Sequence, residues 1–130
     1  MKPLLKPYNM PKESFLQNRL NGVVYAFKGA FLLIRTERSI KAQVVLGLIM
    51  TAAGFYFDIS TIEWIVQTMA IGLVLGAEGL NTAIEKLSDY IQPNHDPKIG
   101  FIKDISAGAV MMVAIAAAVV GLIIYIPKIF

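Results

Sequence analysis

Three acids and one amide are spaced to lie on one side of a predicted helix, inside a stretch that is otherwise apolar. They follow one another at i, i+3, i+7 and i+11, and we call them the polar stripe: Glu78, Asn81, Glu85 and Asp89. Because an α-helix has 3.6 residues per turn, this spacing keeps the four side chains on one face. The residues just before them, 64–75, are apolar enough for a bilayer. An ionisable group in such a segment is costly to hold there, which indicates a functional role.

The positions along the polar stripe suggest two separate roles. Glu78 and Glu85 are two turns apart, roughly 10 Å along the helix, so one cation cannot bridge them. Glu85 and Asp89, nearer to water, suit a hard cation such as Mg²⁺, which takes one or two carboxylates and leaves its other positions to water and phosphate oxygens. Glu78 lies about 12 Å along the helix from Lys86, at the depth of a membrane lipid's hydroxyl. Glu78 is therefore a candidate general base for such a hydroxyl.

A lysine and a further acid, Lys103 and Asp104, open the last apolar segment of the chain. Such a lysine can neutralise phosphate charge, but it can equally be a long side chain that reaches the headgroups from a helix end. Several familiar sites are excluded, since the sequence has no G-x-x-x-x-G-K-[ST], G-x-S-x-G or H-E-x-x-H pattern. It also has no cysteine and one histidine, His95, which excludes thiolate and multi-histidine metal sites. Physical reasoning alone thus reaches a carboxylate site and not a nucleotide.

The elements that must position these residues are predicted to be helices in a membrane. Hydrophobic residues make up 56% of the 130 residues, more than a soluble domain of this size normally has interior for. We expect an all-α membrane protein, with a flexible basic lead at 1–12 and a single domain at 13–130. The domain begins with an amphipathic surface helix at about 13–37, whose apolar side includes Leu20, Phe27 and Ile34. Three membrane spans follow at about 42–58, 62–87 and 105–126.

The connections between the spans carry their own signals. Ser60 and Glu63 form an S-x-x-E pattern, which predicts a capping box at the start of the second span. Gly72 and Gly76 form a G-x-x-x-G pair, which allows another helix to approach closely. Residues 89–104 contain two prolines and are predicted to be a polar loop.

The basic residues set the expected orientation. Eight of the twelve Lys and Arg residues lie in 1–41, none lies in 42–85, and three lie in 86–104. Since lysine and arginine favour the cytoplasmic side, we expect the N-terminus and the 86–104 connection in the cytoplasm and the C-terminus outside. The polar stripe would then lie at the cytoplasmic face.

Two other interpretations of Glu78 remain open at this point. Intramembrane acids and amides can hydrogen-bond between helices, so the chain could be a non-enzymatic membrane protein whose polar residues hold helices together. Alternatively, Glu78 could relay protons or ions in a conducting oligomer. A conductor needs polar groups through the other half of the span as well, and residues 62–75 offer only Glu63, Gln67 and Thr68.

Two longer segments resemble one known family. Residues 78–89, E-G-L-N-T-A-I-E-K-L-S-D, and residues 103–110, K-D-I-S-A-G-A-V, resemble the prokaryotic diacylglycerol kinase family, which includes the undecaprenol kinases. Residues 25–29 and the T-E-R hinge at 36–38 fit as well. The resemblance implies ATP- and Mg²⁺-dependent phosphorylation of a lipid hydroxyl, on undecaprenol or diacylglycerol. It further implies a homotrimer of three-span subunits in the bacterial cytoplasmic (inner) membrane, and no nucleic-acid partner is expected.

The resemblance also implies roles for individual residues. It makes Glu78 the catalytic base, which meets the lipid, and it makes Glu37 and Glu85 the acids that hold the metal. The positions that match nucleotide-binding residues are Tyr25, Glu37, Asn81, Glu85, Asp89, Lys103 and Asp104, with Arg19 and His95 as less specific matches. Some diacylglycerol-specific members carry a further acid where this chain has Gln43. That difference argues against a preference for diacylglycerol, and the A-G-A-V run at 107–110 and the T-E-R hinge make the chain more similar to the undecaprenol-kinase branch.

Overall fold

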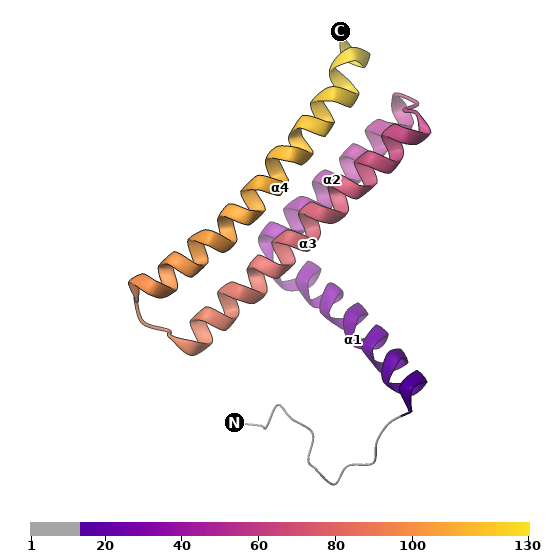
Figure 1. Cartoon of the computed structure of the whole chain (residues 1–130). Helices are drawn as coiled ribbons and strands as arrows, with labels where there is room; N and C mark the ends of the chain where they lie inside the picture. Colours follow the sequence, from indigo (N-terminus) through magenta and orange to yellow (C-terminus); the bar gives the residue numbers. More distant parts are fainter. Residues whose placement is uncertain (1–13) are drawn as a thin grey trace.

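The structure is a computed structural model that describes residues 14–130, and these residues form four α-helices and no strand. The helices are α1 (Phe15–Thr36), α2 (Arg38–Tyr56), α3 (Thr61–Ile91) and α4 (Pro97–Ile129) (Figure 1). The expected basic lead at 1–12, together with residue 13, lies outside the described residues. Three of the helices, α2, α3 and α4, are long and apolar enough to cross a membrane. An all-α fold with three candidate spans is thereby confirmed.

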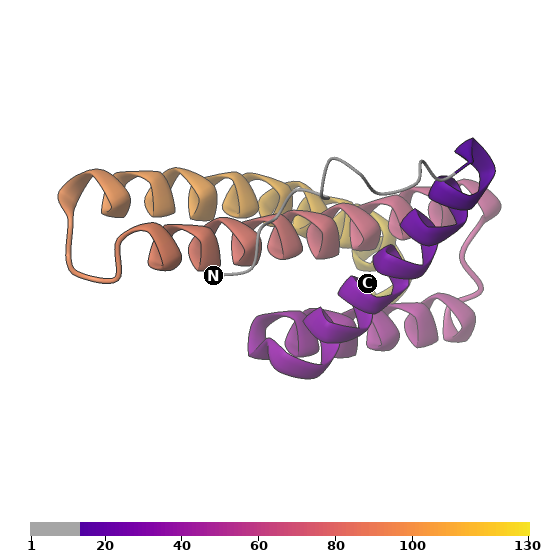
Figure 2. The ribbon, with the colours of Figure 1, turned by 90° about the horizontal axis from the view of Figure 1, so that it is seen from below.

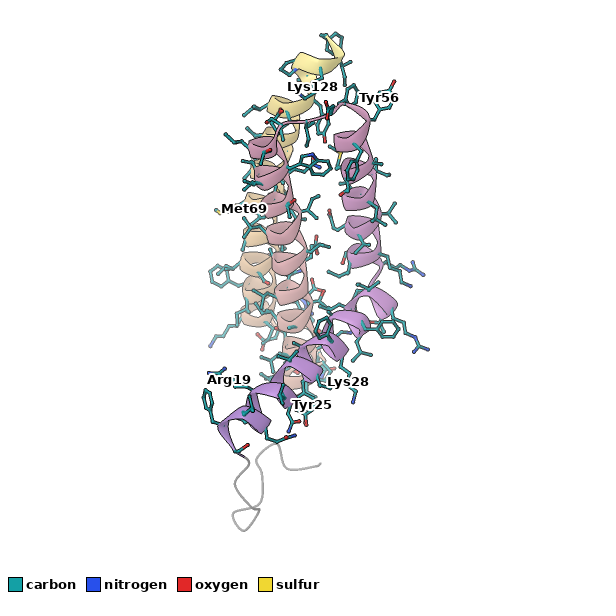
Figure 3. The ribbon with its side chains drawn as sticks, turned by 90° about the vertical axis from the view of Figure 1, so that its right-hand side faces the viewer. Arg19, Tyr25, Lys28, Tyr56, Met69 and Lys128 are labelled. Carbon is teal, nitrogen blue, oxygen red and sulfur yellow. The ribbon has the colours of Figure 1, made fainter. Side chains whose placement is uncertain are left out.

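Most of the first helix, α1, projects away from the other three, and only its C-terminal end contacts them (Figure 3). The Ser14 hydroxyl caps its first turn by accepting a hydrogen bond from the Gln17 backbone N–H at 3.1 Å, one of the donors that a helix start leaves free. No residue of α1 is buried, and Figure 3 shows α1 crossing the end of the bundle at an angle. Large apolar side chains on it, such as Phe27, are exposed and suit contact with lipid. A position on the membrane surface remains the prediction for this helix.

A single residue separates α1 from α2. Glu37 has an extended backbone, with φ −103° and ψ 120°, yet its N–H donates to the Leu33 carbonyl and its carbonyl accepts from the Lys41 N–H, both at 3.0 Å. This residue alone turns the chain, and we call residues 36–38 the α1–α2 corner. The helix of the first span begins at Arg38 and not at 42, because the polar residues after Glu37 continue the helical hydrogen bonding.

The turn between α2 and α3 contains the predicted capping box. The Ser60 hydroxyl accepts from the Glu63 N–H at 3.2 Å, and the Glu63 carboxylate accepts from the Ser60 N–H at 2.9 Å. Asp58, two residues earlier, has a φ of 51°, in the left-handed region that Asp enters more readily than most residues. Ile59 is buried in this turn, so the turn is both capped and packed.

A buried polar cluster joins α2, α3 and α4 at the end of the bundle remote from the α1–α2 corner. We call it the polar knot, and it consists of Gln67, Tyr125 and the backbone carbonyl of Met50. Gln67 Nε2 donates to that carbonyl at 3.0 Å, and the Tyr125 hydroxyl lies 2.5 Å from Gln67 Oε1 and 3.1 Å from the carbonyl. Gln67 is 4% exposed and Tyr125 is 7% exposed. Buried polar atoms in an apolar medium must pair with one another, so the polar knot fixes how the three helices meet.

The connection between α3 and α4 is shorter than the sequence predicted. The polar loop expected at 89–104 was wrong, since α3 runs to Ile91 and α4 starts at Pro97. Proline has a fixed φ and no N–H, which suits the first turn of a helix, and Asp96 caps that turn by accepting from the Lys98 N–H at 2.8 Å. The spans expected at 62–87 and 105–126 are therefore parts of longer helices that run side by side (Figure 2).

The packing of α2 on α3 can be tested at Gly54. A Cβ at this position would lie 2.6 Å from the Trp64 ring and 3.1 Å from Ile59 Cδ1, so Gly54→Ala must displace the ring. Overpacking of this kind costs about 1–3 kcal/mol, and we expect a lower thermal unfolding midpoint in detergent micelles. Gly22→Ala is the matched control, because nothing lies within 4 Å of its Cβ position. Equal midpoints for the two variants would contradict this packing.

Candidate functional site

All four residues of the polar stripe belong to the continuous helix α3, in its C-terminal half. Glu78 and Asn81 are half-buried, whereas Glu85 and Asp89 are exposed. Asn81 Nδ2 donates to Glu85 Oε1 at 3.2 Å. The other polar atom of that side chain, Asn81 Oδ1, is buried and has no hydrogen-bond partner among residues 14–130. Buried polar atoms are normally paired, so this oxygen is free to accept from a donor that is not part of the described chain.

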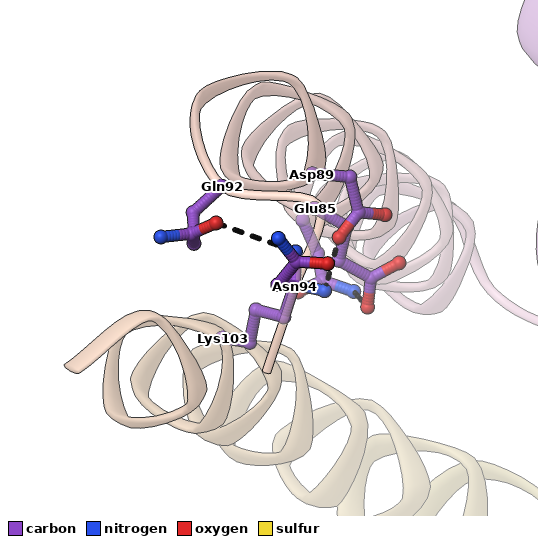
Figure 4. Close-up of polar contacts among 6 residues, drawn as sticks. Glu85, Asp89, Gln92, Asn94 and Lys103 are labelled. Atoms are coloured by element: carbon purple, nitrogen blue, oxygen red, sulfur yellow. Dashed lines mark hydrogen bonds and ion pairs between the residues drawn. The ribbon is translucent and has the colours of Figure 1, made fainter. Parts of the chain in front are cut away.

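Asp89, the last acid of the polar stripe, pairs with a residue of α4. Lys103 Nζ makes an ion pair with Asp89 Oδ1, shown as a dashed line in Figure 4. The two residues reach each other because both helices extend beyond their predicted ends. In the short loop beside them, the Asn94 N–H donates to Gln92 Oε1 at 3.3 Å. A lysine from α4 therefore lies next to the acids of α3, as binding of a phosphate chain would require.

The α1–α2 corner also reaches α3. Lys86 Nζ lies 3.1 Å from Glu37 Oε1, and the Leu33 side chain packs against Gly79. Glu37, which is distant from the polar stripe in sequence, is thus held beside the turn of α3 that carries Glu85. Lys86 was missed as a site residue, because its charge indicated only the orientation of the chain in the membrane.

An apolar groove of about 560 Å³ lies between α2, α3 and α4. It runs from Phe57 and Ile129 past the polar knot, and toward the other end it is lined by Gln43 and Val74. Glu78 is one helical turn beyond Val74, roughly 6 Å along the axis. The groove therefore leads along the bundle toward the half-buried acid of the polar stripe. Much of its α4 wall is made of small residues: Ala114, Ala117, Ala118 and Gly121.

Several expected site residues are not brought to the polar stripe. Arg19 stacks on the Phe15 ring, 5.2 Å from its centroid, and Tyr25 is 67% exposed; Figure 3 shows both on the part of α1 that points away from the corner. His95 lies exposed in the loop after α3, and Asp104 is exposed on α4. Within residues 14–130 the structure shows no hydrogen bond or ion pair from Arg19 or Tyr25 to the polar stripe. Their nucleotide-binding roles stay predictions.

The donor set around Glu85 can be compared with the needs of Mg²⁺. Within the described part of the chain, no three His, Cys, Asp or Glu side chains are grouped closely enough to hold a metal by themselves. Mg²⁺, however, usually takes one or two carboxylates and completes its shell with water and phosphate oxygens. Glu37 and Glu85 supply oxygen ligands of that kind from two neighbouring segments. The two carboxylates therefore fit a Mg²⁺ whose remaining positions are taken by water or phosphate oxygens.

In the other half of α3, Gln67 and Glu63 are paired with groups on α2 and α4. Gln67 belongs to the polar knot, and Glu63 Oε1 lies 3.3 Å from Lys128 Nζ. These side chains serve the packing of the helices and leave no chain of free polar groups that continues from Glu78. The arrangement does not favour a conducting oligomer.

Three helices of spanning length and apolar composition define a membrane protein, and its charged residues gather toward one end of the bundle. The chain belongs to the prokaryotic diacylglycerol kinase family, since the family model described by that name matches residues 24–125.

Named relatives agree with this assignment. The chain is 35% identical over 116 residues to an undecaprenol kinase of Bacillus subtilis, covering 86% of this chain and 94% of the relative. It is 28% identical over 123 residues to a diacylglycerol kinase of Synechocystis sp., covering 94% and 70%. A diacylglycerol kinase of Haemophilus influenzae is 26% identical over 114 residues, covering 88% and 94%. This chain is therefore a membrane lipid kinase of the undecaprenol and diacylglycerol kinase type, for which ATP is the implied co-substrate.

The pair of Asp89 and Lys103 can be tested for a purely structural role. The side chain of Asp89 is 63% exposed and that of Lys103 is 35% exposed, and exposed ion pairs contribute only about 0.2–1 kcal/mol. We expect a double-mutant cycle with Asp89→Asn and Lys103→Met, measured by unfolding in micelles, to give a coupling free energy below about 1 kcal/mol. A coupling of several kcal/mol would show that the pair holds α3 on α4.

Proposed function

We propose that this chain transfers the γ-phosphate of ATP, with Mg²⁺, to the hydroxyl of undecaprenol or diacylglycerol at the cytoplasmic membrane face. The observation that carries this proposal is the position of Glu78, half-buried at the end of an apolar groove and on the same helix as the exposed Glu85. A lipid hydroxyl approaches Glu78 from the membrane, and a polyphosphate approaches Glu85 from water. Phosphoryl transfer needs mainly such positioning and charge neutralisation.

In the proposed site, Glu78 takes the proton of the lipid hydroxyl while the hydroxyl oxygen attacks the γ-phosphorus and ADP leaves. Glu37 and Glu85 would hold Mg²⁺, which would supply positive charge to the phosphates when bound. Lys103 adds a cation beside these phosphates, and the unpaired Asn81 Oδ1 accepts from a donor on the nucleotide. The remaining proposed nucleotide ligands are Tyr25, Asp89 and Asp104, with Arg19 and His95 as less specific candidates.

The apolar groove is the proposed seat of the lipid chain. Apart from Gln43, Gln67 and Tyr125 its lining is apolar, and its small α4 residues leave room for a hydrocarbon chain. A chain that lies there brings its hydroxyl end toward Glu78, about one helical turn away. Burial of the chain against apolar side chains supplies binding free energy without any polar contact.

The proposed assembly is a homotrimer in the bacterial inner membrane, with the N-terminus in the cytoplasm and the C-terminus outside. The distribution of lysine and arginine supports that orientation, and the exposed apolar side of α1 supports its place on the membrane surface. Nothing in the described chain lies within 4 Å of a Cβ placed on Gly72 or Gly76. We therefore expect the helix that approaches Gly72 and Gly76 to belong to a second copy of the chain.

Transfer of labelled phosphate from ATP tests the proposed function. In mixed micelles with Mg²⁺, we expect label in diacylglycerol or undecaprenol, and we expect Glu78→Gln to lose at least about 100-fold in rate because the base is gone. Glu63→Gln, at the other end of α3, is the control and should retain activity. A fully active Glu78→Gln enzyme would remove Glu78 from the catalytic role.

The groove can be tested separately at Ala114. Leucine at this position fills part of the groove, so Ala114→Leu should raise the KM for the lipid by roughly tenfold and leave the KM for ATP unchanged. Ala109→Leu, an exposed residue outside the groove lining, serves as the matched control. Equal KM values for the lipid in the two variants would argue against the groove as the lipid seat.

A further inference from the structure

Lys86 contacts the carboxylate of Glu37, which the proposed function makes a metal ligand. Its Nζ lies 3.1 Å from Glu37 Oε1 and joins α3 to the α1–α2 corner. The motif at 78–89 assigns no role to this lysine. Lys86 directly follows Glu85, and successive helical residues point about 100° apart, so the two side chains project from α3 in different directions.

The two partners of this ion pair differ in exposure. The Glu37 side chain is 23% exposed, whereas the Lys86 side chain is 69% exposed. The backbone of Glu37 is also fixed, because its N–H and carbonyl take part in the hydrogen bonding of α1 and α2. The carboxylate therefore stays at the corner, and the long lysine side chain is the partner that is free to leave.

No other strong partner holds the Glu37 carboxylate within residues 14–130. The Thr36 hydroxyl lies 3.3 Å from Glu37 Oε1, but it lies closer to the Leu32 carbonyl, at 2.7 Å. Glu85 differs, since it accepts from the Asn81 amide at 3.2 Å. Before any metal binds, each proposed metal acid thus has its own partner: an amide for Glu85 and an ammonium group for Glu37.

We propose that Lys86 is a positioning residue that holds Glu37 against α3 until Mg²⁺ arrives with the nucleotide. An ammonium group and a Mg²⁺ ion seek the same carboxylate, and the two cations repel each other at short range. Binding of the metal therefore displaces Lys86 from Glu37. This inference rests on the proposed role of Glu37 as a metal ligand. Lys86 then competes with the divalent cation for Glu37 and lowers the affinity of the site for that cation.

Mn²⁺ binding to the nucleotide-free protein, followed by the electron paramagnetic resonance of free Mn²⁺, tests this competition. We expect Lys86→Met to bind Mn²⁺ about two- to fivefold more tightly, because the free energy of an exposed ion pair corresponds to about that change in a binding constant. Lys86→Arg should bind Mn²⁺ as weakly as the unchanged protein or more weakly, because arginine pairs with a carboxylate through two hydrogen bonds. Lys98→Met removes the same charge from an exposed position at the start of α4 and is the control.

Hydrogen–deuterium exchange gives a second readout that does not depend on activity. Without metal, the amides of residues 38–42 should exchange faster in Lys86→Met than in Lys86→Arg, because the corner has lost its tie to α3. In the kinase assay, the half-saturating Mg²⁺ concentration of Lys86→Met should fall while the KM for the lipid stays constant.

The outcomes separate this inference from the function on which it rests. If Glu37→Gln does not weaken Mn²⁺ binding, the proposed metal role of Glu37 fails, and the inference about Lys86 fails with it. If Glu37→Gln weakens binding while Lys86→Met leaves it unchanged or weaker, only the role of Lys86 is overturned. An equal gain in Lys98→Met would attribute the effect to net charge and would also overturn it.

Discussion

A kinase that brings a lipid hydroxyl to a water-soluble nucleotide must do so where two solvents meet, and the proposed site on α3 is built to suit that boundary. The bilayer interior allows no unpaired backbone polar groups, so the elements that cross it must be continuous helices. A helix rises only 1.5 Å per residue, and acids on one of its faces can therefore sample successive depths. The spacing of Glu78, Glu85 and Asp89 spreads three acids from the half-buried part of α3 to its exposed end. One helix face thus spans the boundary that the reaction has to cross.

The two ends of the bundle are held by interactions of different character. The polar knot joins three helices through hydrogen bonds that are almost completely buried, and breaking one of them leaves a polar atom without a partner in an apolar medium. The corner at the other end depends on an exposed lysine and on the contact between Leu33 and Gly79. Exposed pairs contribute little free energy and open readily. The bundle is therefore held more firmly at the polar knot than at the corner, which is the end where the proposed site lies.

Local patterns predicted the parts of the fold that local forces decide. The capping box at Ser60 and the common side of the polar stripe follow from nearest neighbours and helical periodicity, and the structure contains both. The loop at 89–104 was wrong because charges and prolines were taken as helix breakers. Pro97 instead occupies a first helical turn, and Lys103 is paired with Asp89 on the neighbouring helix.

Contacts between distant segments left no signal in the sequence. The pairing of Lys86 with Glu37 and of Gln67 with Tyr125 depends on how the helices cross, which no spacing within one helix encodes. The chemical roles of the site residues came from resemblance, because carboxylates and a lysine at a membrane face do not by themselves specify a nucleotide. The distance of Tyr25 and Arg19 from the polar stripe likewise depends on the angle of α1, which a single extended residue sets.

The lengths of the helices have a consequence for the membrane itself. Helix α2 has 19 residues and α3 has 31, so they measure roughly 28 Å and 46 Å, against a hydrocarbon core of about 30 Å. Only α2 matches the bilayer, while α3 and α4 project beyond it as a two-helix post. Thickening of the membrane would shift the plane of the lipid hydroxyls along that post without moving the acids on it. If Glu78 has its proposed role, bilayer thickness becomes a variable of catalysis, because it sets whether the hydroxyl and Glu78 meet at the same height.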